Sequence, residues 1–142
     1  MKIKIKRIDK SLPFPTYKTA GAVAFDCYVR IATTVEPQKI AHIPLNICIK
    51  PPKNHYVFLA ARSSLSKRGL IFANGIGIGD EDFCGNGDEY HAAVFNFTNQ
   101  PVTVERGDRI AQMIIKPYEK AEFEEVEDLE SQNRGGFGTT GK

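Results

Sequence analysis

The sequence lacks several features that mark particular classes of protein. Its 142 residues include no Trp, only 2 Met and only 3 Cys. The cysteines are odd in number and have no C-x-x-C spacing, so they favour a reduced compartment over a disulfide framework. No apolar stretch is long enough for a membrane-spanning helix, and residues 1–10 alternate charge with isoleucine where a signal peptide would be apolar. These absences predict a soluble, intracellular (cytoplasmic) protein with no membrane partner.

The chain also lacks a strong charge of either sign and the length for two domains. With 19 basic and 17 acidic residues the net charge is +2, so nothing in the overall charge favours a nucleic-acid partner. A chain of this length forms one domain, which can bury about 68% of the surface that the unfolded chain exposes. This is enough for one core, but not for a second domain with a pocket of its own. We therefore expect any site for a sizeable ligand to be a surface cleft or to lie between subunits.

What the sequence does contain is a repeated alternation of apolar and polar residues with a period of two. Val23, Phe25, Cys27, Val29 and Ile31 share one predicted strand face. The same alternation, broken by Gly, Pro and Asn turn signals, recurs in residues 1–10, 43–49, 56–61, 90–97, 102–105 and 110–115. Many short strands predict an antiparallel all-β sandwich or barrel.

One short helix is expected before the end of the chain. Ser63 is a candidate N-cap, residues 64–68 make one or two turns, and Gly69 ends them. Residues 119–130 hold seven acidic residues against one lysine, with three apolar residues at a spacing of three, so they form either an extended arm or a short helix. Residues 132–142 place four glycines around Phe137, which predicts a mobile lid able to wrap an anion.

The segment N-G-I-G-I-G-D-E-D, residues 74–82, is the most unusual stretch. Asn-Gly predicts a tight hairpin, and the alternating glycines strip one strand face of side chains. This indicates either crowded packing or the close approach of a planar ligand to the backbone. Asp80 and Asp82 would share a face if the strand continues. They are either solvated acids or carboxylates that orient water or hold Mg²⁺ through water.

Two further segments carry groups suited to anions. In R-S-S-L-S-K-R-G-L, residues 62–70, a cap serine follows an arginine, although ordinary helix capping explains that serine equally well. In R-G-D-R-I-A-Q-M-I, residues 106–114, Gln112 lies on an apolar strand face, where a buried amide needs a partner. The three histidines share no ligand spacing with the cysteines, so a zinc site is not expected.

Taken in order, these segments resemble the five motifs of the trimeric dUTPase family. The first is A-G-A-V-A-F-D-C-Y, residues 20–28, and the fifth is R-G-G-F-G-T-T-G at the end of the chain. The resemblance implies a jelly-roll-like distorted β-barrel with one short helix and a flexible C-terminal arm. It divides the chain into a β domain, residues 1–131, and a lid, residues 132–142.

The resemblance also implies hydrolysis of dUTP to dUMP and pyrophosphate by water attack on the α-phosphate. Asp80 falls on the aspartate that positions the attacking water. The remaining implied roles fall on substrate-binding residues and two supporting acids: Arg62, Ser63, Ser64 and Gln112 for phosphate, Asn74 and Gly77 for uracil, Phe83 for deoxyribose, Arg134, Phe137, Gly138, Thr139 and Thr140 in the lid, and Asp26 and Asp82 in support. Mg²⁺ would be held mainly by substrate phosphates and water, in a homotrimer whose subunits share the active sites.

Several positions depart from the family pattern. Asn86-Gly87-Asp88 resembles an insertion, Gly79 replaces a usual isoleucine and Phe83 a usual tyrosine, and the fifth motif is shortened. The main alternative is a dCTP deaminase, or a bifunctional dCTP deaminase/dUTPase, of the same fold. Its deaminating glutamate would fall on Ala93, three residues before Asn96. A second alternative is a nucleotide-binding protein of this fold without turnover.

Overall fold

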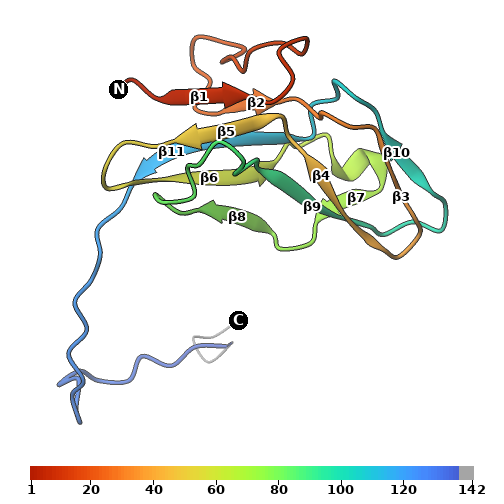
Figure 1. The fold of residues 1–142 in the computed structure, drawn as a ribbon. Helices are drawn as coiled ribbons and strands as arrows, with labels where there is room; N and C mark the ends of the chain where they lie inside the picture. Colours follow the sequence, from red (N-terminus) through yellow and green to blue (C-terminus); the bar gives the residue numbers. More distant parts are fainter. Residues whose placement is uncertain (138–142) are drawn as a thin grey trace.

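The computed structural model describes residues 1–137, in which the secondary structure is almost entirely β (Figure 1). Short strands with β-branched and apolar residues alternate with Gly, Pro and Asn turns, as the period-two pattern predicts. The strands are β1 (Lys4–Arg7), β2 (Phe25–Cys27), β3 (Thr33–Val35), β4 (Ile40–Pro44), β5 (Ile47–Lys50), β6 (His55–Ala61), β7 (Leu70–Phe72), β8 (Ile76–Gly79), β9 (His91–Asn96), β10 (Val102–Val104) and β11 (Ala111–Pro117).

Every strand pair in this part of the chain is antiparallel. The largest sheet has the order β2-β11-β6-β8, a second has the order β4-β9-β7, and β1 pairs with β5 and β10 with β3. One apolar core joins side chains from these sheets. The arrangement is a jelly-roll-like sandwich, and within residues 1–137 the hydrogen bonds do not close it into one barrel.

Burial of the predicted apolar face is confirmed in the core and fails at its edges, but within residues 25–29 the burial does not alternate, since Asp26 and Tyr28 are buried as well. Phe25, Cys27 and Val29 are buried, but Val23 and Ile31 are 73% and 50% exposed because β2 is only three residues long. In segment 43–49 the predicted apolar face is buried, but so are the residues between, and the burial does not alternate. The chain passes from β4 to β5, which lie in different sheets, through Asn46 with its φ of 64°. The alternation did not predict β3 and β7, which have three residues each.

The predicted helix is a single 3₁₀ turn over Ser66–Arg68, and the predicted cap is wrong. Its N-cap position is Leu65, and no side chain caps it. Leu65 is buried, so packing of this apolar residue fixes the start of the turn. Gly69 ends the turn as predicted, in the left-handed conformation, and its N–H donates to the Ser66 carbonyl.

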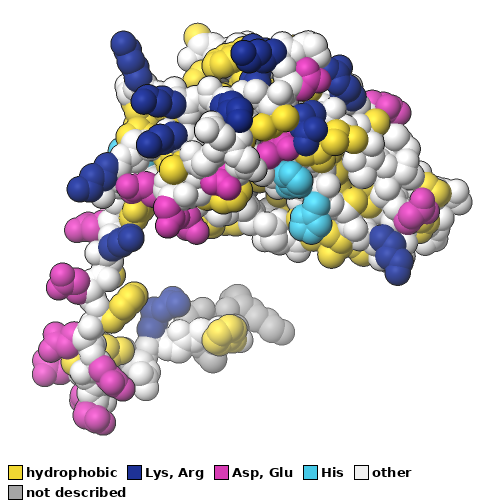
Figure 2. All heavy atoms as spheres, viewed as in Figure 1, with side chains coloured by type: hydrophobic (Ala, Val, Ile, Leu, Met, Phe, Trp, Pro, Cys, Tyr) yellow, Lys and Arg dark blue, Asp and Glu magenta, His cyan; other side chains and the backbone are white. Residues whose placement is uncertain are grey.

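After β11 the chain leaves the body and runs as an extended segment to residue 137 (Figure 1). Residues 119–130 were predicted to form either an extended arm or a short helix. The helix prediction is wrong, since neither helix nor strand is present there. The apolar residues at spacing three gain little contact, and Phe123 is 97% exposed. Figure 2 shows acidic side chains gathered along this segment, whose like charges favour an extended chain.

No helix among residues 1–137 is both long and apolar enough to cross a membrane.

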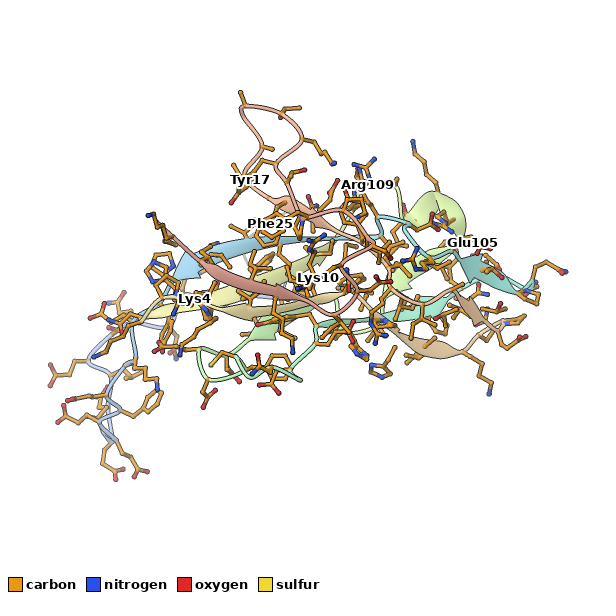
Figure 3. The ribbon with its side chains drawn as sticks, turned by 45° about the horizontal axis from the view of Figure 1, so that its top comes forward. Lys4, Lys10, Tyr17, Phe25, Glu105 and Arg109 are labelled. Atoms are coloured by element: carbon orange, nitrogen blue, oxygen red, sulfur yellow. The ribbon has the colours of Figure 1, made fainter. Side chains whose placement is uncertain are left out.

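The loop that carries Tyr17 projects from the body beside β2. There the Tyr17 ring packs edge to face on the Phe25 ring, with ring centres 5.9 Å apart (Figure 3).

A half-buried ion pair holds the start of β9 against the neighbouring strands. Arg30 donates Nε–H to one carboxylate oxygen of Glu89 at 2.8 Å and Nη2–H to the other at 2.6 Å. The Asn46 N–H also donates to Glu89, at 2.9 Å. Burial alone would raise the pKa of Glu89, but the hydrogen bonds from Arg30 and Asn46 outweigh it, and the pKa lies below its ordinary value of 4.5.

We expect Glu89→Gln to lower the free energy of unfolding at pH 7 by about 2 kcal/mol, because it removes a charged acceptor from a partly buried pair. A depressed pKa in the folded state stabilises the protein above the ordinary carboxyl range, and this contribution disappears as the pH falls through the folded-state pKa. The difference between wild type and variant should therefore shrink at pH 3. Urea denaturation at both pH values measures it, with the exposed Arg106→Gln as a control of smaller effect. An equal loss at both pH values would contradict the assignment.

Candidate active site

One hollow of about 210 Å³ lies beside β2, where β6 ends and β11 begins. It is lined by Lys18, Ala22, Ala24, Asp26, Arg62, Ser63 and Gln112. The strand register assembles it, since Gln112 of β11 stands opposite both Asp26 of β2 and Ala60 of β6. Four predicted residues from three separate motifs thus meet in what we call the anion hollow.

Asp26 organises the charges of the anion hollow. It is 7% exposed, and its two carboxylate oxygens face different arginines. Oδ1 lies 3.1 Å from Arg62 Nε, and Oδ2 accepts from Arg109 Nη1 at 2.9 Å. Arg62 also donates to the Arg109 carbonyl at 3.1 Å. Two cations share one carboxylate, and of the two arginines Arg62 lines the hollow.

A third cation and an amide complete this hollow. Lys18 Nζ donates to the Tyr28 hydroxyl at 3.0 Å and lies 5.6 Å from the centre of that ring, so the ammonium group is held in place. The predicted partner of Gln112 is confirmed, because its Nε2 donates to the Ala61 carbonyl at 3.0 Å. Gln112 is only half-buried, so its amide oxygen remains exposed to the hollow.

A second hollow of about 350 Å³ lies between β8 and β9, and we call it the slot. It is lined by Leu59, Phe72, Asn74, Gly77, Ile78, Gly79, Asp80, Phe83, Glu89, Tyr90, His91 and Ala93. The predicted Asn74-Gly75 hairpin is wrong. Its turn is present, with Gly75 at φ 70°, but β7 pairs with β9 whereas β8 pairs with β6. The turn passes the chain between two sheets, and no β8–β9 ladder closes the space.

The alternating glycines of β8 are explained by crowding. A Cβ built on Gly77 would lie 3.2 Å from Leu59 Cβ. A Cβ on Gly79 would lie 2.2 Å from Tyr90 Oη, far inside contact distance. The packing interpretation therefore holds for Gly79, where the Tyr90 ring occupies the room of the usual isoleucine. Gly77 meets Leu59 and also lines the slot.

The condition under which Asp80 and Asp82 would share a strand face is not met, because β8 ends at Gly79. The chain turns there, with the Phe83 N–H donating to the Asp80 carbonyl at 3.1 Å. Asp80 lines the slot and also a larger hollow of about 900 Å³, which contains Asp82 as well. Phe83 is 38% exposed at the slot and packs edge to face on Tyr90 with ring centres 5.2 Å apart.

The larger hollow also has basic and aromatic residues in its lining. Lys50, Lys53, Tyr56, Tyr118 and Lys120 line it. Glu81 fixes the turn to this wall by accepting from the Tyr118 hydroxyl and the Asn54 N–H, both at 2.7 Å. These two hydrogen bonds lower the pKa of Glu81, so its carboxylate stays ionised while it holds the turn that carries Asp80.

Among residues 1–137, the predicted site residues that line the slot and those that line the anion hollow share no hollow, and Asp82 lines only the larger one. Ser64 is exposed and lines neither. Arg134 and Phe137 lie exposed on the extended segment, and Gly138, Thr139 and Thr140 lie outside the described residues.

Sequence reasoning missed Lys18, Arg109 and Tyr90. Arg109 lay inside the fourth motif, but nothing in the pattern marked Lys18, and Tyr90 counted only as a strand residue.

The residues fit a magnesium ion held largely by its substrate. Within residues 1–137 no three His, Cys, Asp or Glu side chains gather as a metal cage. Both oxygens of Asp26 already face arginines, whereas Asp80 and Asp82 face the large hollow with exposed side chains. Mg²⁺ keeps several waters and is commonly bound by one or two carboxylates together with phosphate oxygens. This donor set suits such a shared site.

The dUTPase family model matches residues 10–141. The chain belongs to the dUTPase family. It is 39% identical to the deoxyuridine 5'-triphosphate nucleotidohydrolase of Finegoldia magna, over 98% of this chain and 99% of that protein. It is 40% identical to the protein of the same name from Desulfitobacterium hafniense, over 99% and 95%.

Solved dUTPase structures share the fold. The Staphylococcus bacteriophage 80alpha dUTPase with dUPNHPP matches at a TM-score of 0.86 and 21% identity, covering 99% of each chain. A variant dUTPase from phage phi11 of S. aureus, whose structure describes the coordination of a structural Mg(II) ion, matches at 0.80 and 17% identity, over 92% of this chain and 100% of that one.

We expect Gly79→Ala to destabilise this dUTPase by about 1–3 kcal/mol, because the new methyl group would overlap the Tyr90 hydroxyl. Gly21→Ala is the matched control, since a Cβ there meets nothing within 4 Å. Thermal unfolding of both variants measures the difference. Adding Tyr90→Leu to Gly79→Ala should recover most of the loss, and a double variant no more stable than Gly79→Ala would contradict the clash.

Proposed function

We propose that this protein hydrolyses dUTP to dUMP and pyrophosphate, which keeps uracil out of DNA and supplies dUMP for thymidylate synthesis in the cytoplasm. One observation carries the proposal. The chain pairs a cationic hollow, lined by Arg62 and Lys18, with a largely apolar slot that has Asp80 on its wall. A nucleoside triphosphate needs one surface of each kind.

The slot is the proposed place of the nucleoside. Asn74 would meet the edge of uracil, and the backbone at Gly77 would pass close to the base. Phe83 stands exposed where it can pack under deoxyribose and exclude a ribose 2′-hydroxyl by its bulk. The phosphates would lie on Arg62, Ser63, Ser64 and Gln112. A slot of about 350 Å³ suits a pyrimidine nucleoside.

A homotrimer with shared active sites is part of the proposal. The anion hollow and the slot have no residue in common in the described part of the chain, so one substrate that uses both is most simply bound by two subunits. The extended segment after β11 carries Arg134 and Phe137 away from its own body, which suits delivery to a neighbouring subunit. There Arg134 would clamp the terminal phosphate, Phe137 would stack on uracil, and residues 138–140 would close over the phosphates.

The proposed chemistry is in-line attack of water on the α-phosphate. The Asp80 carboxylate would orient the water and accept its proton, while Asp82 and Asp26 order the surrounding site. Arg62 and the N–H groups beside Ser63 would stabilise the charge that develops on the phosphate oxygens. Bound Mg²⁺ would supply charge neutralisation across the phosphates. Glu81 keeps the turn in place through Tyr118 and Asn54.

The same geometry weighs against the deaminase alternative. Ala93 lines the slot at the position where a deaminase would need its glutamate. The acids that line the slot are Asp80 and Glu89, and Glu89 is engaged by Arg30 and Asn46.

The direct test incubates the purified protein and Mg²⁺ separately with dUTP, dCTP, dTTP and UTP, and follows pyrophosphate and ammonia. We expect pyrophosphate and dUMP from dUTP, and no ammonia from dCTP. Ammonia release would favour the deaminase. Comparable pyrophosphate from dTTP or UTP would contradict the proposed selectivity of the slot.

We expect Asp80→Asn to retain affinity for a non-hydrolysable dUTP analogue while losing at least about 10²-fold in kcat, the lower range for removal of a general base. Glu81→Gln is the control, because the amide keeps an acceptor oxygen for Asn54 and Tyr118. Steady-state kinetics and calorimetric titration separate the two effects. An unchanged kcat in Asp80→Asn would remove Asp80 from the mechanism.

A further inference from the structure

The Tyr90 hydroxyl is a buried polar group without a hydrogen-bond partner within residues 1–137. The residue is 5% exposed, and its side chain forms part of the wall of the slot. Buried hydroxyl groups nearly always have a partner, since an unsatisfied one costs about 1–3 kcal/mol. Within these residues, Tyr90 carries the only such buried side-chain oxygen or nitrogen.

The backbone and two neighbours determine where this hydroxyl lies. The Tyr90 backbone is held by the segment that joins β4 to β5. Its N–H donates to the Ile47 carbonyl at 3.0 Å, and its carbonyl accepts from the Leu45 N–H at 2.9 Å. Gly79 leaves the space into which the ring extends, and a Cβ there would lie 2.2 Å from Tyr90 Oη. The Phe83 ring packs edge to face on the Tyr90 ring, with an interplanar angle of 85°. The phenol is thus positioned between Gly79 and Phe83 in the wall of the slot, where the described residues offer its hydroxyl no partner.

Two departures from the family pattern are thus linked in space. Phe83 lacks the hydroxyl of the usual tyrosine, and Gly79 lacks the side chain of the usual isoleucine. Tyr90 fills the room left by Gly79 and places a phenol against Phe83. Burial, and then the negative charge of Asp80, raise the pKa of Tyr90, so the phenol stays protonated and able to donate.

We infer that Tyr90 is a substrate-binding residue that donates a hydrogen bond from its buried hydroxyl to an oxygen of the deoxyribose in the slot. The inference rests on the proposed function. The sugar is favoured over the base because Tyr90 packs on Phe83 and lies near Asp80, whereas Asn74 is the residue proposed for the base edge. The deoxyribose of a nucleotide offers two such acceptors, the 3′-hydroxyl and the ring oxygen O4′, and we assign the contact to the 3′-hydroxyl.

Tyr90→Phe removes the hydroxyl and keeps the ring. We expect it to weaken binding of α,β-imido-dUTP and raise the KM for dUTP about tenfold, with kcat changed less than about twofold. The thermal midpoint of the free protein should be equal or higher, because the variant also removes an unsatisfied buried group. If the hydroxyl were only structural, its removal would not weaken substrate binding while leaving the thermal midpoint equal or higher. Tyr56→Phe is the control, since Tyr56 is half-buried outside the slot.

Substrates that lack the 3′-hydroxyl locate the contact. With 2′,3′-dideoxyuridine triphosphate, wild type and Tyr90→Phe should have nearly equal KM values. An equal loss with both substrates would overturn the assignment to the 3′-hydroxyl. An unchanged KM for dUTP, or a loss of affinity accompanied by a lower thermal midpoint, would overturn the inference.

Failure of the proposed function gives a different result. A wild-type protein that binds α,β-imido-dUTP through Tyr90 but does not hydrolyse dUTP would contradict the reaction and support the contact. A protein that binds no analogue would contradict both.

Discussion

The β6–β11 ladder is the constraint on which both halves of the site depend. Seven residue pairs join these strands, from Ala111 opposite Ala61 to Pro117 opposite His55. At one end β11 also pairs with β2 and places Gln112 opposite Asp26. On its other edge β6 pairs with β8, which forms one side of the slot. A register slip of one residue would turn Gln112 and the core residues to the wrong faces, so the ladder fixes the chemistry together with the packing.

The two hollows obtain their character in different ways. In the anion hollow a nearly buried carboxylate orders two arginines, and the positive charge of Arg62 and Lys18 is what a phosphate would neutralise. In the slot the shape comes from what is missing: β8 carries glycines, and it pairs with β6 instead of β9. Tyr90 then replaces the lost side-chain volume with a ring and brings a hydroxyl that has no partner in the described chain.

Sequence reasoning succeeded where the signal is local. Alternating apolar residues predicted most strands and the core, and the left-handed residue that ends the 3₁₀ turn was found from Gly69 alone. It failed where packing overrides the local signal. Asn74-Gly75 has the composition of a hairpin turn, yet β7 before it pairs with β9 and β8 after it pairs with β6, in different sheets. Ser63 has the composition of a cap, yet buried Leu65 starts the turn.

The sequence by itself determined the all-β class, the five motifs in order, the absence of a metal-binding His and Cys spacing, and the residue types able to hold a triphosphate. These depend on periodicity and on order along the chain, which need no tertiary information. Only the tertiary structure decided that Asp26 joins Arg62 to Arg109, that the anion hollow and the slot are separate in one chain, and that Gly79 is needed by Tyr90. Each of these depends on how separate segments of the chain come together, which is set by strand register and close packing, and no local pattern encodes it.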